Sequence, residues 1–586
     1  MSYIKNFILC LLLSGFGISV LSSVNAAPIT AERLANAATS EPHNWLTVHK
    51  DFNSSRFADL GMINRSNVHR LVPKFTVATG GLDKKGLFGS GGNEGTPLVN
   101  DGMMYVQNPW NVVMKLDVSS GNKAKILWVF DPEVPPETGD LPVTRGVALA
   151  PGLVIINTLD GRVIAVDDES GDEVWSRQVA DGEGESMTLA PIVVGDNIIT
   201  ANSAGDWGTR GWIESLKISD GSQNWRMYTI PAPGEPGSET WLDDHDAWKT
   251  GGGAKWVSGS VDLDQNVYIF GTGNPVPMYD PEARPGDNLF TNSVIAADLD
   301  TGEMKWYFQY TPGDYLDYDE TGVHLLYDAE VNGETRKVVG HFGRNGFYYQ
   351  LDRNNGSFIS GAQYVNKLTW TDGLDPKTGK PLGYDASAPL QEYVAGGAPR
   401  RGKEGVLGCP HIQGGVNFFP TSYNPNLGYA YGAGMEACTA AVTTAEDAAE
   451  QAANAKPGSI YIGGGTETTD KVKGSLTAMD VSTGEMVAKY QNEVLNYAGV
   501  MSTPTLTCTS WADGEVSCHD ARTLDKLWSF NIGMTLSAPP MTYAVNGKQY
   551  IAVQGGGSVI VSASGMNVPE LEGMQPGSTL FVFGLN

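Results

Sequence analysis

The segment MKLDVSSGNKAKILW (residues 114–128) holds the pattern that decides the fold, because the chain repeats it. A β-prone stretch leads to Asp117, a glycine turn follows, and a second β-prone stretch ends in Trp128. Acidic or amide residues followed by glycine favour the tight turn of a β-hairpin. Each copy therefore predicts two antiparallel strands. Clear copies recur in IAVDDESGDEVW (164–175), SLKISDGSQNW (215–225) and IAADLDTGEMKW (295–306).

The spacing of the copies predicts the architecture. Asp117, Asp167 and Lys217 follow one another at intervals of 50 residues, enough for a four-stranded sheet with its loops. The tryptophans that end the copies are expected to pack between neighbouring sheets. Weaker copies follow in YQLDRNNG (349–356), TAMDVSTGEMV (477–487) and CHDARTLDKLW (518–528).

Seven copies and a terminal strand at 581–586 predict an all-β fold: an eight-bladed β-propeller with tryptophan-docking repeats, closed by pairing the two chain ends. The long gaps at 225–295 and 356–477 are expected to hold loop insertions on the functional face. Helical periodicity is confined to two short segments, 31–38 and 445–455.

The overall composition fits this architecture and excludes some functions. The 586-residue chain is 41% hydrophobic and contains 72 Gly and 14 Trp, which suits a turn-rich β protein. Its formal net charge of −27 argues against nucleic acid or an anionic membrane surface as a partner.

The N-terminus has the features of a secretory signal. Lys5 precedes an apolar run from Phe7 to Val20, and Val24-Asn25-Ala26 offers a small-residue cleavage site. The apolar run is short for a membrane span. We therefore expect a signal peptide over 1–27, a single mature domain over 28–586 without a membrane span, and localisation in the periplasm.

The cysteines fit an exported protein. Cys10 lies in the predicted signal, and four cysteines remain, an even number that favours disulfides. Cys508 and Cys518 flank an Ala-Asp-Gly turn symmetrically, so a hairpin would set them at bridging distance. No Cys-x-x-Cys-His occurs, so the sequence predicts no covalently attached haem.

Residues 270–319 carry the chemistry. Asn274 lies in a Gly-Thr-Gly-Asn-Pro turn, and Asp317 and Asp319 lie near the end of the stretch TPGDYLDYDE (311–320). Amide and carboxylate oxygens suit a calcium-like or trivalent cation. If the backbone is extended there, the two aspartates point the same way. The sequence therefore predicts a metal site with a possible catalytic base.

GTGNP, the following RPGDN (284–288) and TPGDYLDYDE together resemble the pyrroloquinoline-quinone (PQQ) dependent alcohol dehydrogenases. The resemblance extends over essentially the whole mature chain. It implies that Asp206, Asn274, Asp317 and Asp319 hold one Ca²⁺ or lanthanide ion. Family members that use lanthanides carry an extra Asp where Asp319 stands. Asp206 replaces the usual Glu ligand and is one methylene shorter.

The resemblance also implies a PQQ site and a second disulfide. Asp317 would be the catalytic base, and Arg344 would stabilise negative charge beside the quinone. The second disulfide would join Cys409 and Cys438, where the family has a bridge. The cofactor contacts that the resemblance implies are Glu94, Arg145, Thr188, Ser203, Gly205, Trp256, Arg344, Asn417 and Tyr497.

The activity implied is oxidation of an alcohol, with hydride transfer to PQQ and onward electron transfer to an acceptor such as a periplasmic cytochrome c. A homodimer is compatible with the resemblance. Three departures favour an alcohol larger than methanol: a missing Cys-Cys pair before Arg145, Leu316 in place of a Trp, and insertions at 381–400 and 439–457.

Two alternatives remain open. One is a quinoprotein for bulky secondary alcohols, such as polyols, polymeric alcohols or mycotoxin hydroxyls. The other is a propeller scaffold without catalysis, which should lack the ligand set.

Overall fold

The repeated hairpins form antiparallel sheets. The computed structural model describes residues 26–86, 89, 91–138, 141–331, 333–403, 405–443, 448–557 and 566–586. In these ranges, most strands belong to eight four-stranded antiparallel sheets. The predicted signal segment lies outside the described residues, apart from Ala26 and Ala27.

The first four sheets follow one another along the chain. They contain β3 (Leu98–Asn100), β4 (Met103–Gln107), β5 (Val113–Asp117) and β6 (Lys125–Phe130); β8 (Ala148–Ala150), β9 (Leu153–Asn157), β10 (Arg162–Asp167) and β11 (Glu173–Gln178); β12 (Ile192–Val194), β13 (Asn197–Ala201), β14 (Trp212–Lys217) and β15 (Gln223–Tyr228); β16 (Ser260–Asp262), β17 (Val267–Gly271), β18 (Ser293–Asp298) and β19 (Met304–Gln309).

The other four sheets use the second half of the chain and one N-terminal strand. They contain β20 (His324–Val331), β21 (Glu334–Phe342), β22 (Phe347–Asp352) and β23 (Phe358–Gln363); β25 (Ser422–Asn424), β26 (Tyr429–Glu436), β29 (Lys473–Asp480) and β30 (Met486–Asn492); β31 (Val500–Ser502), β32 (Leu506–Ser510), β33 (Glu515–Asp520) and β34 (Lys526–Asn531); β35 (Met541–Val545), β36 (Lys548–Gly555), β37 (Thr579–Leu585) and β1 (Leu71–Ala78).

The repeat tryptophans pack between neighbouring sheets, as the sequence predicts. The indole N–H of Trp128 on β6 donates to the Asp168 carbonyl of the next sheet at 3.0 Å. Gly171 in that turn has a φ of +80°, and a Cβ there would lie 2.7 Å from the Trp128 ring. Only glycine therefore allows the ring this close. Equivalent bonds join Trp175 to Ile218, Trp225 to Leu299 and Trp528 to Leu71.

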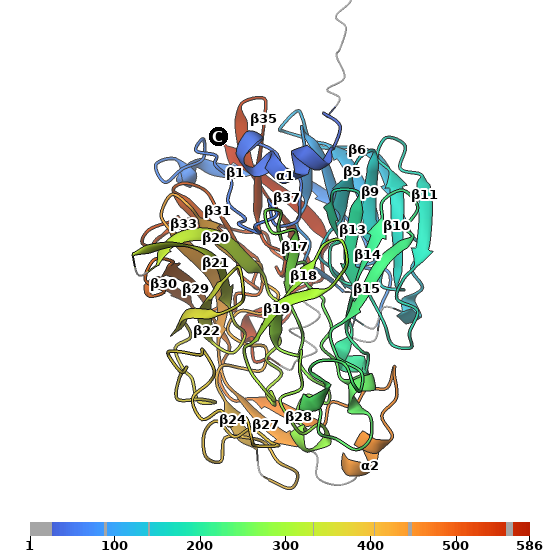
Figure 1. The fold of residues 1–586 in the computed structure, drawn as a ribbon. Coiled ribbons are helices and arrows are strands. Elements are labelled where there is room, and N and C mark those ends of the chain that lie inside the picture. The colour runs from blue at the N-terminus through green and yellow to red at the C-terminus, as the bar shows by residue number, and fades with distance from the viewer. Residues whose placement is uncertain are drawn as a thin grey trace, which may run out of the picture.

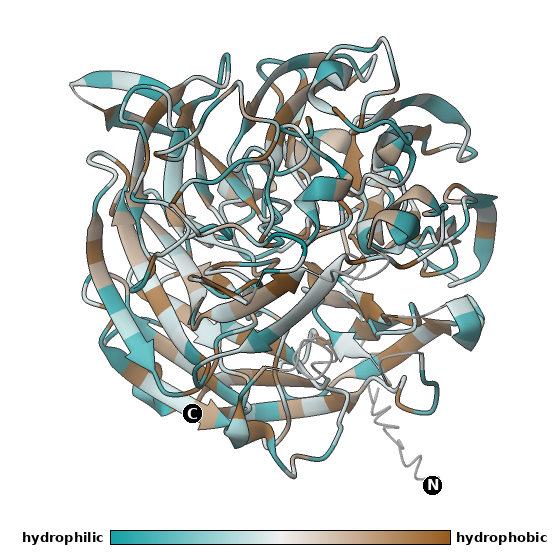
Figure 2. Ribbon diagram, turned by 90° about the horizontal axis from the view of Figure 1, so that it is seen from below, coloured by the Kyte–Doolittle hydropathy of each residue, from teal (hydrophilic) through white to brown (hydrophobic). Residues whose placement is uncertain are grey.

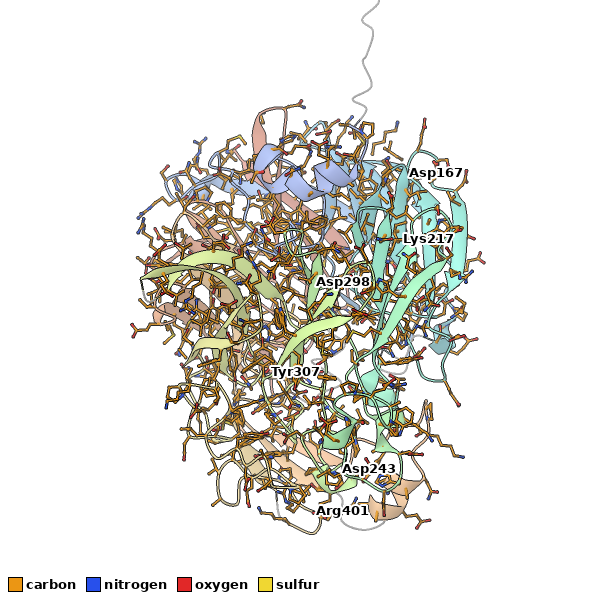
Figure 3. All side chains as sticks on the ribbon, in the orientation of Figure 1. Asp167, Lys217, Asp243, Asp298, Tyr307 and Arg401 are labelled. Carbon is orange, nitrogen blue, oxygen red and sulfur yellow. A yellow bond between two sulfur atoms is a disulfide. The ribbon has the colours of Figure 1, made fainter. Side chains whose placement is uncertain are left out.

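The two ends of the chain share a sheet. β37 lies between β36 and β1, with Leu71 opposite Leu585 and Ala78 opposite Thr579. In Figure 1 the red C-terminal strands stand beside the blue N-terminal segment. This confirms the predicted pairing of the chain ends. Figure 3 labels Asp167, Lys217 and Asp298, which begin the turns of three successive sheets, from the upper right of the view to its centre.

The predicted loop insertions are only partly correct. The gap 225–295 contains the regular strands β16 and β17 as well as loops. These strands lack the Asp-Gly-Trp signature because that signature belongs to the second hairpin of the sheet, β18–β19. The gap 356–477 contains β23, β25, β26 and the start of β29, which all belong to regular sheets, and only the part between β23 and β25 and the part between β26 and β29 are insertions.

Those insertions form a separate cap at one end of the molecule. β24 (Val406–Gly408), β27 (Thr439–Thr443) and β28 (Gly464–Thr468) make a three-stranded sheet, and α2 (Ala448–Ala453) follows β27. Figure 1 places these elements at the end opposite α1 (Ala31–Ser40). Both helices fall where the sequence predicts helical segments, although residues 444–447 lie outside the described ranges.

Both predicted disulfides are present. Cys508 and Cys518 face each other across β32 and β33, and Cys409 bridges to Cys438 beside the cap. Seen from the cap end, the outer strands of the sheets alternate between hydrophilic and hydrophobic residues (Figure 2). Within the described ranges, helices are too short or too polar to cross a membrane.

Shorter elements complete the fold. A two-stranded parallel sheet joins β2 (Gly92–Asn93) to β7 (Val143–Thr144). The 3₁₀ turns are η1 (Val68–Arg70), η2 (Pro136–Thr138), η3 (Gly205–Trp207), η4 (Ser238–Thr240), η5 (Ala247–Thr250), η6 (Pro281–Ala283) and η7 (Pro569–Leu571).

Candidate active site

The parallel pair β2–β7 sets Glu94 beside Arg145. Asn93 is opposite Thr144, so the residue that follows each strand lies at the same edge. Gly91 makes this possible, because a Cβ there would lie 2.3 Å from the Pro142 carbonyl oxygen. The Arg145 guanidinium pairs with the Glu94 carboxylate at 2.7 Å, and both side chains are buried.

Arg145 also links three other predicted cofactor contacts. Its guanidinium donates to the Thr188 hydroxyl at 2.7 Å and to the Trp256 carbonyl at 3.1 Å. The Thr188 and Ser203 hydroxyls lie 2.9 Å apart. The Arg145 guanidinium lies 4.8 Å from the centre of the Trp256 ring, a cation–π distance.

A second arginine organises the aspartates. Arg344 follows β21 and is 3% exposed. Its guanidinium donates to Asp317 Oδ2 at 2.8 Å and binds Asp319 Oδ2 closely, and its Nε donates to the Ile412 carbonyl at 2.7 Å. One buried cation therefore faces two buried carboxylates.

The two aspartates meet for a different reason from the one predicted. They lie in the loop between β19 and β20, not in a strand, and Asp317 has a φ of +61°. Positive φ is rare for a residue with a Cβ. The extended-strand argument is therefore wrong, and Arg344 and the loop bring the carboxylates to one side.

Asn274 and Asp206 complete the oxygen set. The backbone N–H of Asn274, just after β17, donates to Asp319 Oδ1 at 2.7 Å. The Asp206 side chain on η3 lies close enough to the Asn274 side chain for the amide to lower the pKa of Asp206, against the larger effect of burial. Its neighbour Gly205 packs closely on Ala254, since a Cβ would lie 3.2 Å from the Ala254 Cβ.

The carboxylates repel one another in this low-dielectric site. Removal from bulk water, together with the charge of Asp319, raises the pKa of Asp206 to about 7. Burial also raises the pKa of Asp317 well above its usual range, against the opposing effect of Arg344. Burial raises the pKa of Glu94 to about 7. A bound cation would relieve this repulsion.

A cavity of ≈ 930 Å³ connects the two arginine clusters. It reaches every predicted cofactor or metal residue except Glu94 and Tyr497. Glu94 lies behind Arg145, and the fully buried Tyr497 donates to the Gln413 side chain at 2.9 Å. The predicted residues that line the cavity are Arg145, Thr188, Ser203, Gly205, Asp206, Trp256, Asn274, Asp317, Asp319, Arg344 and Asn417.

Sequence analysis did not predict some of the residues that line the cavity. Met278 and Tyr279 lie only four and five residues beyond Asn274, so their position was a usable signal. Ile460, Ile462 and Thr466 come from the cap, whose course no repeat pattern indicates. The 381–400 insertion does not contribute to the lining, and neither does Leu316, which packs in the core beside Gly408.

The residues present fit both a cation and a polar cofactor. Asp317 Oδ1 is buried and has no hydrogen-bond donor among the described residues, as expected for an oxygen free to bind a cation or a substrate hydroxyl. Arg145 Nε is likewise a buried donor without an acceptor in those ranges. Carboxylate and amide oxygens alone form the metal set, which suits Ca²⁺ or a lanthanide.

Comparison with known proteins agrees with this chemistry. Residues 45–365 match the family described as "PQQ: Glucose/ethanol/alcohol dehydrogenase, beta-propeller domain". Quinoprotein alcohol dehydrogenase PedH of Pseudomonas putida is 32% identical, over 93% of this chain and 91% of PedH. The putative dehydrogenase XoxF of Paracoccus denitrificans is 30% identical, over 95% and 94%.

A solved structure is similar along nearly the whole chain. A europium-containing methanol dehydrogenase superposes with a TM-score of 0.83 at 27% identity, covering 94% of this chain and all of its own. The family match, the relatives and the constellation of oxygen ligands and arginines lead to one assignment. The chain belongs to the family of PQQ-dependent alcohol dehydrogenases.

Proposed function

We propose that this protein is a periplasmic dehydrogenase that oxidises alcohols larger than methanol with PQQ and one Ca²⁺ or lanthanide ion. The observation that carries the proposal is the buried cluster of three carboxylates and one amide beside Arg344, in a cavity shared with Arg145 and Trp256. Burying more carboxylates than cations is costly, and a bound cation would offset that cost. The free Asp317 oxygen faces no donor among the described residues.

Each side chain has a distinct role in this proposal. Asp206, Asn274, Asp317 and Asp319 would hold the ion, while Trp256 supplies a flat surface and Arg145 a cation for a planar anionic cofactor. Bound PQQ supplies the hydride acceptor and the ion supplies Lewis acidity. Asp317 accepts the proton of the alcohol hydroxyl, and Arg344 keeps that carboxylate oriented.

The cavity wall supports a substrate with an apolar body. Leu141 lines it from the segment that lacks the Cys-Cys pair, and Ile412 lies beside Arg344. The cap adds Ile460 and Ile462, and the Tyr279 N–H donates to the Ile462 carbonyl at 3.0 Å. Burying alkyl surface here would favour longer primary or bulky secondary alcohols.

The wider setting of the enzyme completes the proposal. We infer an eight-bladed propeller, in which Tyr550 of the last sheet lies against Gly121 of the first. The predicted signal supports export to the periplasm, and the acidic net charge suits a basic electron acceptor such as a cytochrome c. A homodimer is compatible with this proposal.

The test is dye-linked oxidation by apoprotein given PQQ with Ca²⁺ or La³⁺, over alcohols from methanol to bulky secondary alcohols. We expect activity only when both PQQ and a cation are added, with a higher kcat/KM for larger alcohols than for methanol. Activity without PQQ would contradict the mechanism, and a preference for methanol would contradict the substrate. Absence of both activity and PQQ binding would favour the non-catalytic scaffold.

A further inference from the structure

A buried glutamate and histidine lie directly behind the aspartate–arginine cluster. Glu320 follows Asp319 in the chain, and His341 lies on β21 three residues before Arg344. His341 Nε2 is 2.7 Å from Glu320 Oε2, and the two side chains are 1% and 0% exposed. Neither lines the cavity, so neither can contact the substrate.

The same glutamate oxygen also holds the Arg344 backbone. Glu320 Oε2 accepts a hydrogen bond from the Arg344 N–H at 3.1 Å. Gly343 leaves space for this contact, because a Cβ there would lie 3.2 Å from both carboxylate oxygens. The glutamate is fixed in turn by its own N–H, which donates to the Thr272 carbonyl at 3.1 Å.

His341 is held from its other side. Its Nδ1 lies 3.1 Å from the Val323 carbonyl, which requires a hydrogen on Nδ1. His324 is its direct partner across β20 and β21, and the two rings stack in parallel at 4.0 Å. The Tyr310 hydroxyl lies 3.1 Å from His324 Nε2. The imidazole therefore has one orientation, with Nε2 aimed at Glu320.

We propose that Glu320 and His341 form a positioning pair, which fixes the backbone of Arg344 so that its guanidinium bridges Asp317 and Asp319. The inference rests on the proposed function, because it assigns the pair a role through Arg344. Groups that orient the residues of a metal site typically change affinity or activity by about 10- to 100-fold when removed.

Glu320→Gln tests the pair without changing the size of the side chain. In Glu320→Gln, an amide oxygen at the Oε2 position accepts from Arg344, but a neutral His341 that keeps its one hydrogen on Nδ1 for Val323 has none on Nε2 to donate to that oxygen. An amide nitrogen there donates to His341 but cannot accept from Arg344. Either rotamer loses one contact, although the side chain keeps its size. His341→Gln, in contrast, can keep a donor to Glu320, whereas His341→Leu cannot.

The experiment measures the dissociation constant of PQQ by tryptophan quenching, and kcat and KM, with La³⁺ present. We expect Glu320→Gln and His341→Leu to weaken PQQ binding and lower kcat by about 10- to 100-fold, with His341→Gln close to wild type. KM for the alcohol should change by less than about threefold. His519→Leu is the matched control, since His519 is buried, bonded at both ring nitrogens and outside the cavity.

A double-mutant cycle separates positioning from general destabilisation. In an Arg344→Ala background, Glu320→Gln should change PQQ affinity and kcat by less than about twofold, because no guanidinium remains to be positioned. Equal losses in both backgrounds, or wild-type values for Glu320→Gln and His341→Leu, would overturn the positioning pair alone. A wild-type protein that binds no PQQ with either cation would overturn the proposed function and the pair together.

Discussion

The two arginines of the cavity differ in how their charges are balanced. Arg145 faces one carboxylate, Glu94, at 2.7 Å, with hydroxyl and carbonyl groups around it. Arg344 faces both Asp317 and Asp319, and Asp206 adds a third carboxylate nearby. The Arg145 cluster is thus close to neutral, whereas the Arg344 cluster has excess negative charge. Under the proposed function, this difference divides the cavity into a binding end at Arg145 and a cation-dependent reacting end at Arg344.

Removing the proposed base at the acidic end should have the largest effect. Asp317→Ala is expected to lower kcat by about 10²- to 10⁴-fold while PQQ stays bound, because the alcohol proton then has no acceptor. Steady-state kinetics and the absorbance of bound PQQ measure the two quantities. Asp314→Asn is the comparison, since Asp314 caps the same loop through the Leu316 and Tyr318 N–H groups without lining the cavity. Near wild-type turnover in Asp317→Ala would remove it as the base.

The loss of activity on replacing Asp319 should depend on the charge of the bound metal ion. Asp319→Ala is expected to reduce lanthanide-supported activity about tenfold more than calcium-supported activity, because a trivalent ion depends more on the number of anionic ligands. Activity is measured over a concentration series of each ion. Equal losses with both ions would argue against a lanthanide-specific role.

A substitution in the Arg145 cluster, where the charges are balanced, should affect PQQ binding more than turnover. Arg145→Lys loses the planar fork that pairs with Glu94 and lies over Trp256. Loss of one charge-assisted hydrogen bond costs about 1.5–3 kcal/mol, so PQQ should bind about tenfold or more weakly. With saturating PQQ, kcat should stay within a few-fold of wild type. A large fall in kcat at saturation would contradict the division between the two ends.

The smallest effect is a pH dependence of stability. In the absence of a cation, Asp206 has a folded-state pKa of about 7, above its usual value, so the folded form holds a proton that the unfolded form has lost. Stability of the apoprotein should therefore fall as pH rises from about 4 through about 7. Tm with chelator should be lower near pH 8 than near pH 5, and La³⁺ should remove or reverse this trend. Asp206→Asn should flatten it, and an apoprotein Tm that rises with pH would contradict the account.

The repeated segments could be predicted from sequence because each is a local structure. Asp117, the following glycine turn and Trp128 lie within 15 consecutive residues, and the tryptophan needs only the next copy to pack against. The first two strands of the fourth sheet, β16 and β17, carry no such signature, so the gap that contains them was expected to hold loop insertions. The cap depends on contacts between distant segments, such as the ion pair of Arg401 with Asp280. Figure 3 shows Arg401 at the cap end.

The identity of the site residues could be predicted from the sequence, but their arrangement in space could not. Resemblance identified Asp317, Asp319 and Arg344, and they do meet, but through a loop with positive φ at Asp317 that no local rule predicts. Glu320 and His341 gave no signal, because their pairing joins the β19–β20 loop to β21, which come together only in the folded chain. Tyr497, a predicted cofactor contact, does not line the cavity and donates to Gln413, which does.

The most direct test of the central claim is a calorimetric titration of La³⁺ into apoprotein in the presence of PQQ, compared with an Asp206→Asn, Asp319→Asn double variant. The unbalanced charge at Arg344 predicts one tight site per chain in the wild type and a large loss of affinity in the double variant. Wild-type protein that binds no ion, or a double variant that binds as tightly, would contradict the claim.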